Sequence, residues 1–273
     1  MTTNRIRIGL RLFAALRYQR SGSVHSVMAI LAKGVCFCLL AASFTFHQAA
    51  AADDAPQLSN LSRPLTAQKS ETQPVLAHRP KRANFERESA SYDARHVADW
   101  VVDSGDNRSM PFVIVDKTAA KVFVFYADGR LRGVTPALFG QARGDDSVPG
   151  IGNRKISSIR REERTTPAGR FVSTLDRNLR GEDILWVDYD AAISMHRVHT
   201  NNPKDRRLQR LATPTPLDNR ISYGCINVPV NFYDNIVRPA FTGTNGIVYI
   251  LPETRSIREV FASYYDVEEH ARL

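Results

Sequence analysis

Short runs of β-branched and aromatic residues recur along the second half of the chain. Residues 112–116 read Phe-Val-Ile-Val-Asp, residues 122–126 read Val-Phe-Val-Phe-Tyr, and Ala-Asp-Gly-Arg at 127–130 is typical of a hairpin turn. Four more runs of this kind follow, at residues 170–175, 184–189, 192–196 and 246–251. The pattern predicts a β-rich fold.

Helical patterns are few. Residues 231–237 form one short candidate, and residues 256–265 form a better one. In the second, Ser256 and Glu259 have the spacing of a capping box, and apolar side chains recur on one face. The Gly-rich and charged stretch at 140–164 predicts a loop.

The beginning of the chain has the pattern of an export signal. Lys33 precedes 13 mostly apolar residues at 34–46, and the alanines at 49–52 lead into two aspartates. This order is typical of a cleavable signal peptide, and the run is shorter than the about 20 residues of a membrane span. An uncleaved membrane-anchoring helix is the alternative. We expect cleavage and a periplasmic or cell-envelope location, with Met28 as the true start.

These patterns predict four regions. Residues 1–51 are a signal peptide, and residues 52–109, rich in Pro, Ser, Gln, Arg and Asp, are a flexible extension of low order with one short element over 97–102. Residues 110–252 form a single β-rich domain with few short helices, and residues 253–273 form a helical tail. The predicted fold class is mainly β.

The net charge of +9 belongs mostly to the leader. The first 52 residues hold six of the 37 Lys and Arg residues and none of the 28 Asp and Glu residues, so the excess of cations falls to three beyond them. Nucleic acid as a partner therefore loses its main support.

Of three cysteines, Cys36 and Cys38 lie inside the predicted signal, so the mature chain keeps Cys225 alone. Neither an intrachain disulfide nor a Cys-based zinc site is then available. Cys225 lies in Asp-Asn-Arg-Ile-Ser-Tyr-Gly-Cys-Ile-Asn at 218–227, directly after a glycine that permits a tight turn. A nucleophilic thiol needs such access, and a small buried hydrophobe is the competing interpretation.

A base for this thiol is available upstream, where His196 ends a β-rich run and His199 follows it. In a strand, two residues three apart point to opposite faces, so at most one imidazole is expected to face Cys225.

Further motifs resemble the L,D-transpeptidase catalytic domain, the YkuD family. They occur in the family's order over about 140 residues, at 115–131 (VDKTAAKVFVFYADGRL), 166–171 (TPAGRF), 193–196 (ISMH), 222–227 (SYGCIN) and 243–250 (GTNGIVYI). The resemblance implies a YkuD-like fold of mixed sheets, sandwich-like or barrel-like, and a cysteine acyltransferase that acts on peptidoglycan stem peptides. It implies no cofactor and no metal.

The same resemblance assigns roles. Cys225 is the expected nucleophile, His196 its base, Gly224 an amide donor to the oxyanion, and the carbonyl of Arg197 the group that orients the imidazole. Expected substrate-side residues are Tyr223, Ser222, Asn227, Arg220 and His199, with Ser222 and Asn227 expected mainly to hold the motif together. The acceptor of the acyl group is left open: a second stem peptide, a lipoprotein lysine, a D-amino acid, or water in an L,D-carboxypeptidase. Family members also form thioesters with carbapenems.

Two features depart from the family pattern. Tyr223 stands where the family usually has a second histidine, which affects substrate positioning. The spacing of 29 residues between His196 and Cys225 is longer than usual, and the basic insert 201–210, expected as a loop over the site, accounts for it.

Three alternatives remain. A non-catalytic wall-binding protein of the same fold would not need both His196 and Cys225. A metal site built from His196, His199, Asp188 and Asp190 does not match a helical His-Glu-x-x-His arrangement. A papain-like protease would have its cysteine upstream of its histidine, the reverse of the order here.

Overall fold

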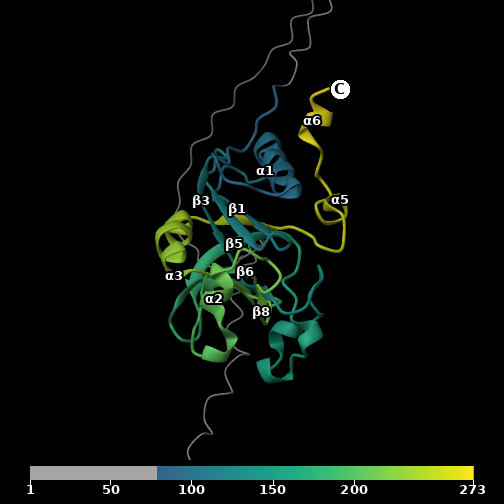
Figure 1. Cartoon of the computed structure of the whole chain (residues 1–273). Coiled ribbons are helices and arrows are strands. Elements are labelled where there is room, and N and C mark those ends of the chain that lie inside the picture. The colour runs from purple at the N-terminus through teal and green to yellow at the C-terminus, as the bar shows by residue number, and fades with distance from the viewer. Residues whose placement is uncertain (1–78, 273) are drawn as a thin grey trace, which may run out of the picture. The chain divides into compact units, whose positions relative to one another are not determined.

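The computed structural model describes residues 79–272. Their centre is an eight-stranded mixed sheet of order β3-β2-β1-β10-β5-β6-β7-β9 (Figure 1). The strands are β1 (Phe112–Asp116), β2 (Lys121–Phe125), β3 (Leu131–Pro136), β5 (Gly169–Arg177), β6 (Asp183–Asp188), β7 (Ile193–Arg197), β9 (Ile226–Val228) and β10 (Gly246–Ile250). The pairs β1/β10 and β7/β9 are parallel, and the others are antiparallel. The prediction of a mainly β fold is confirmed.

The two edges of this sheet meet. Leu138 lies just beyond edge strand β3, and it exchanges two backbone hydrogen bonds of 2.9 Å with Asn227 in the opposite edge strand β9. A parallel pair, β4 (Phe139–Gly140) with β8 (Arg220–Ser222), continues the contact. The sheet is therefore nearly closed into a barrel-like form, which leaves few free edges.

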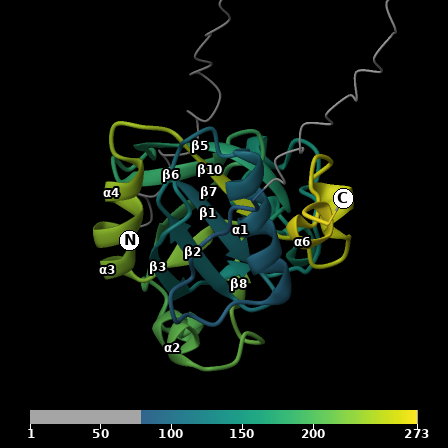
Figure 2. The ribbon, with the colours of Figure 1, turned by 90° about the horizontal axis from the view of Figure 1, so that it is seen from above.

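The central strands are buried on both faces. In β1, Val113 and Val115 face one apolar cluster, whereas Phe112 and Ile114 face a second. The helical segment of α3 (Val230–Phe232), the π-helical turn Tyr233–Val237 and α4 (Arg238–Phe241) covers the first cluster. Helix α1 (Tyr92–Ser104) covers the second (Figure 2). Two covered faces explain why these strands appear as continuous apolar runs in the sequence.

Helix α1 differs from the sequence interpretation, which placed residues 52–109 in an extension of low order. Ser91 caps its first turn, Gly105 ends it in the left-handed conformation, and its face of Ala94, Val97 and Val101 is buried. Charged residues between the buried Ala, Val and Trp side chains had concealed this helical period. The predicted signal peptide and residues 52–78 lie outside the described residues.

The C-terminal segment 253–273 also differs in part from the predicted helical tail. The predicted capping box of Ser256 and Glu259 is present, but α5 (Ile257–Val260) ends before the buried Phe261, and a second short helix, α6 (Val267–His270), follows. The predicted loop at 140–164 contains three single-turn 3-10 helices, at Ile151–Asn153, Ile156–Ser158 and Arg161–Glu163. No helix among the described residues is long and apolar enough to span a membrane.

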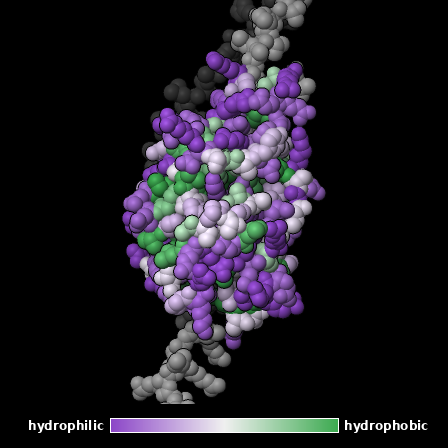
Figure 3. Space-filling model, viewed as in Figure 1, coloured by the Kyte–Doolittle hydropathy of each residue, from purple (hydrophilic) through white to green (hydrophobic). Residues whose placement is uncertain are grey.

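The insert between His196 and Cys225 is folded. It forms the 3-10 turn Pro203–Asp205 and helix α2 (Arg207–Ala212). Hydrophilic side chains gather at the α2 end of the domain in Figure 3.

Candidate active site

The nucleophile candidate lies in a turn that accepts glycine alone. Cys225 lies between β8 and β9, and Gly224 before it has a φ of +130°. A Cβ at Gly224 would approach Ile193 Cδ1 to 2.6 Å and the carbonyl oxygen of Thr165 to 2.8 Å. Both the dihedral angle and the packing therefore require a residue without a side chain.

Hydrogen bonds fix the backbone of this turn. The Thr166 hydroxyl donates to the carbonyl of Gly224 at 2.7 Å and accepts the amide of Gly140 at 2.8 Å. The Ser222 hydroxyl donates to the carbonyl of Cys225 at 2.6 Å and accepts the amide of Gly224 at 3.1 Å. The Gly224 amide, expected as an oxyanion donor, is thus engaged within the turn in this structure.

The half-buried Cys225 thiol faces β7. Its Sγ lies 3.6 Å from the hydroxyl of Ser194 and 3.6 Å from the carbonyl oxygen of Ala192. Burial by itself raises the pKa of the Cys225 thiol, but a hydrogen bond with His196, the charge of His196 and a hydrogen bond with Ser194 outweigh it and lower the pKa. The surroundings therefore favour the thiolate.

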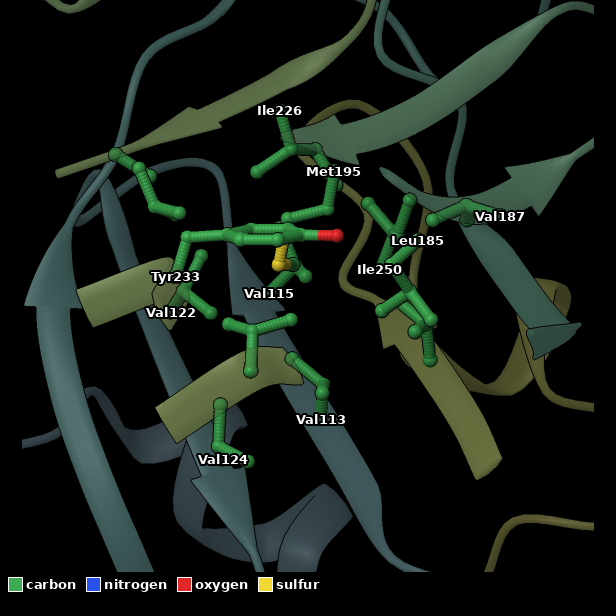
Figure 4. Close-up of a cluster of buried hydrophobic side chains, with 14 of the residues drawn as sticks. Val113, Val115, Val122, Val124, Leu185, Val187, Met195, Ile226, Tyr233 and Ile250 are labelled. Carbon is green, nitrogen blue, oxygen red and sulfur yellow. The ribbon is translucent and has the colours of Figure 1, made fainter. Parts of the chain in front are cut away.

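Strand alternation places His196 on the thiol side. Met195 packs into the first apolar cluster, beside Ile226 of β9 (Figure 4), so Ser194 and His196 point to the opposite face of β7. His196 Nδ1 lies 2.7 Å from the carbonyl oxygen of Arg197. A carbonyl only accepts, so Nδ1 carries a proton and Nε2 is the nitrogen that can exchange one.

The pKa of His196 is shifted opposite to that of the thiol. Burial lowers the pKa of His196, but its hydrogen bond with Cys225 and the negative charge there outweigh burial and raise it. A lowered thiol pKa and a raised imidazole pKa together favour a thiolate–imidazolium pair.

Asn227 connects this pair to the insert. It is the register partner of His196, and its side-chain amide nitrogen lies 3.4 Å from His196 Nε2 and donates to the carbonyl of Cys225 at 3.2 Å. Its amide oxygen accepts from Arg207 Nη1 at 2.6 Å. Because Arg207 can only donate, it fixes which end of the buried amide faces His196.

His199 lies beside His196, contrary to the expectation of opposite faces. The two ring centroids are 4.8 Å apart. Strand β7 ends at Arg197, so alternation no longer governs residue 199. Burial and the charge of His196 lower the pKa of His199, which favours a neutral second imidazole.

The side chains of Arg197 and of Arg220, which was expected on the substrate side, are both paired with carboxylates of the protein. The Arg197 side chain contacts Asp234 at 2.6 Å and Asp183 at 3.2 Å. The Arg220 guanidinium contacts Glu253 at 2.6 Å. Only the backbone of Arg197 reaches the site, whereas Tyr223 exposes its ring at the surface.

Sequence reasoning missed two residues of this site. Ser194 contacts the thiol, and its position two residues before His196 in a strand was a usable signal. Thr166 was seen only as part of a motif, and its bond to Gly224 joins segments 58 residues apart.

A buried lysine supports the segment that carries Thr166. Lys117 Nζ donates to the carbonyls of Gly144 (2.7 Å) and Thr166 (3.0 Å) and to Asp145 (2.8 Å). Burial lowers the pKa of Lys117 despite its acidic neighbours. Asp145 in turn accepts three backbone amides from residues 253–255, each at 2.8 Å.

We expect Lys117→Met to lower the free energy of unfolding by about 3–5 kcal/mol, because Asp145 would remain buried without its cation. Guanidinium denaturation measures the change. The control, Lys155→Met at an exposed position of the loop 140–164, should stay within about 0.5 kcal/mol of wild type. Equal stability of the two variants would contradict the role given to Lys117.

Within residues 79–272, no group of three His, Cys, Asp or Glu side chains could hold a metal ion, so the set weighed for a metal site is not gathered into one.

No family model and no curated protein matches this sequence. One similar solved structure is an L,D-transpeptidase from Mycobacterium smegmatis, with 13% identity and a TM-score of 0.30 over 52% of this chain and 58% of that one. A second is the catalytic domain of the E. faecium L,D-transpeptidase, with 17% identity and a TM-score of 0.30 over 52% of this chain and 98% of that one. A third is the helical cell shape determining protein Pgp2 from Campylobacter jejuni, with 16% identity and a TM-score of 0.37 over 64% of this chain and 59% of that one. This chain thus spans less than two thirds of the first and third proteins. Several other similar solved structures are also described as L,D-transpeptidases.

Proposed function

We propose that this protein is an exported cysteine acyltransferase that acts on peptidoglycan stem peptides as an L,D-transpeptidase. The observation that carries the proposal is the position of His196 on the thiol side of β7: Ser194, two residues before it, lies 3.6 Å from the Sγ of Cys225, and His196 Nδ1 is held on the carbonyl of Arg197 at 2.7 Å. Nucleophile, base and orienting group are the three parts of an activated nucleophile. A binding module would need none of them.

In the first half-reaction, the Cys225 thiolate adds to the carbonyl carbon of the third stem residue, diaminopimelate. The amide bond to the terminal D-Ala breaks, the departing nitrogen takes the proton from His196 Nε2, and a thioester remains. Because the Gly224 amide donates to Ser222, stabilisation of the oxyanion falls to the amides of Tyr223 and Cys225.

In the second half-reaction, an acceptor amine gives its proton to His196, attacks the thioester and releases the thiolate. The acceptor is the amine of a second stem peptide. Water in its place would give an L,D-carboxypeptidase, and a lipoprotein lysine would give a protein–wall linkage. His199, a neutral imidazole beside His196, lies where it can contact the incoming acceptor.

The test is incubation of the purified protein with disaccharide-tetrapeptide muropeptides, followed by mass spectrometry. Cross-linked dimers with loss of D-Ala are the expected products. Tripeptides alone would identify the carboxypeptidase. Unchanged tetrapeptides, together with no mass increase on incubation with a carbapenem, would contradict the proposal.

A further inference from the structure

A half-buried arginine stacks on the one residue of the nucleophile motif that departs from the family pattern. The guanidinium carbon of Arg164 lies 3.8 Å from the centroid of the Tyr223 ring. Arg164 also donates from Nε and Nη2 to the carbonyl of Ile159 (3.2 and 3.1 Å) and from Nη1 to the side-chain oxygen of Gln141 (3.0 Å). These contacts hold the guanidinium in one position.

The charge of Arg164 has no counter-ion among the described residues. All of its acceptors are uncharged, and three of its five N–H groups are used. Neighbouring arginines differ: Arg154 pairs with Glu163 at 2.9 Å, and Arg207 pairs with Asp205 at 2.9 Å. A rigid, partly desolvated cation with unused donors is suited to bind an anion from outside the chain.

Two segments of the chain connect Arg164 with the turn that carries Cys225. The two residues after it pack on the nucleophile turn: the Thr165 carbonyl closes the space beside Gly224, and the Thr166 hydroxyl bonds the Gly224 carbonyl. On the other side, Tyr223 directly precedes Gly224. The Arg164–Tyr223 pair therefore borders the turn that carries Cys225.

We propose that Arg164, supported by the ring of Tyr223, binds a carboxylate of the acyl-donor stem peptide beside the bond that Cys225 attacks. This inference rests on the proposed function. The carboxylate is either that of the terminal D-Ala or that of the diaminopimelate side chain. Tyr223 is suited to this role because a neutral aromatic ring attracts a guanidinium, whereas a histidine would repel it when protonated.

The first test compares Arg164→Gln with wild type on three stem tetrapeptides: unmodified, amidated at D-Ala, and amidated at diaminopimelate. For the unmodified peptide, KM should rise by about 10- to 100-fold, the size of a charge-assisted hydrogen bond. For the peptide that lacks the recognised carboxylate, the variant and wild type should agree within about twofold, and this peptide identifies which carboxylate binds. Arg161→Gln, an exposed position in the same loop, is the matched control and should behave as wild type. An equal KM rise on all three peptides would overturn the proposal.

A second test does not depend on muropeptide turnover. Iodoacetate and iodoacetamide alkylate the same thiol, but only iodoacetate is an anion. The ratio of their rates at Cys225 should fall at least severalfold in Arg164→Gln and stay unchanged in Arg161→Gln. The iodoacetamide rate serves as the check that the turn is intact. An unchanged ratio in Arg164→Gln would overturn the anion site. If wild-type protein leaves tetrapeptides unprocessed, that result contradicts the proposed function but not the anion site.

Discussion

Replacing Cys225 with alanine should remove all conversion of tetrapeptide muropeptides and all mass increase from a carbapenem, while the fold stays intact. Both reactions should be lost because no other cysteine is present among the described residues to form the thioester. The fold should persist because Cys225 is half-buried, belongs to none of the apolar clusters, and lies 3.6 Å through Sγ from both Ser194 and Ala192. Mass spectrometry of products and of the protein measures the first effect, and thermal denaturation measures the second.

Cys225→Ser is the companion variant. It keeps a hydroxyl in place of the thiol, but an ordinary hydroxyl is not ionised near neutral pH, so acylation should fall below detection as well. Muropeptide processing by the Cys225→Ala protein would remove the cysteine from the mechanism and with it the proposed function.

The second large effect concerns the two histidines. His196→Ala should slow acylation by about 10²- to 10⁴-fold, the usual contribution of a general acid–base group, whereas His199→Ala should keep most of the rate. The reason is that His196 lowers the pKa of the thiol through its hydrogen bond and its charge, while His199 contacts the ring of His196. Single-turnover acylation by a carbapenem measures both.

The pH profile of thiol alkylation separates these residues further. In wild type the pKa of Cys225 is lowered, so iodoacetamide should react at pH values below the ordinary thiol pKa of about 8.5. His196→Ala removes the hydrogen bond and the charge but leaves the burial, which raises the pKa of the thiol. The midpoint should therefore move upward in His196→Ala and hardly at all in His199→Ala. A larger upward shift in His199→Ala would show that the base had been assigned to the wrong imidazole.

Local patterns in the sequence determined much of this fold. The apolar runs predicted six of the strands in the central sheet, most directly β1 and β10, which are buried along their whole length. The capping box at Ser256 and Glu259 was predicted because its bonds join residues three apart. Helix α1 was expected only as a short element over 97–102, because charged residues separate the residues of its buried face and its packing on the sheet is what makes it stable.

Some features of the candidate site were also indicated by the local sequence, and others were not. Glycine before a lone thiol indicated the tight turn at Cys225, and a histidine at the end of a strand indicated its partner, because both depend on residues adjacent in the chain. Strand alternation did not predict the direction of the His199 side chain, because β7 ends at Arg197.

Tertiary structure alone decided which side chains surround the pair. Arg207 reaches Asn227 across 20 residues, Arg164 stacks on Tyr223 across 59, and Thr166 holds Gly224 across 58. Each of these contacts forms between segments that the folded sheet brings together, and their energy depends on the final distance between two groups. A pattern of neighbouring residues carries no information on that distance, so the sequence indicated the candidate nucleophile and the fold determined its environment.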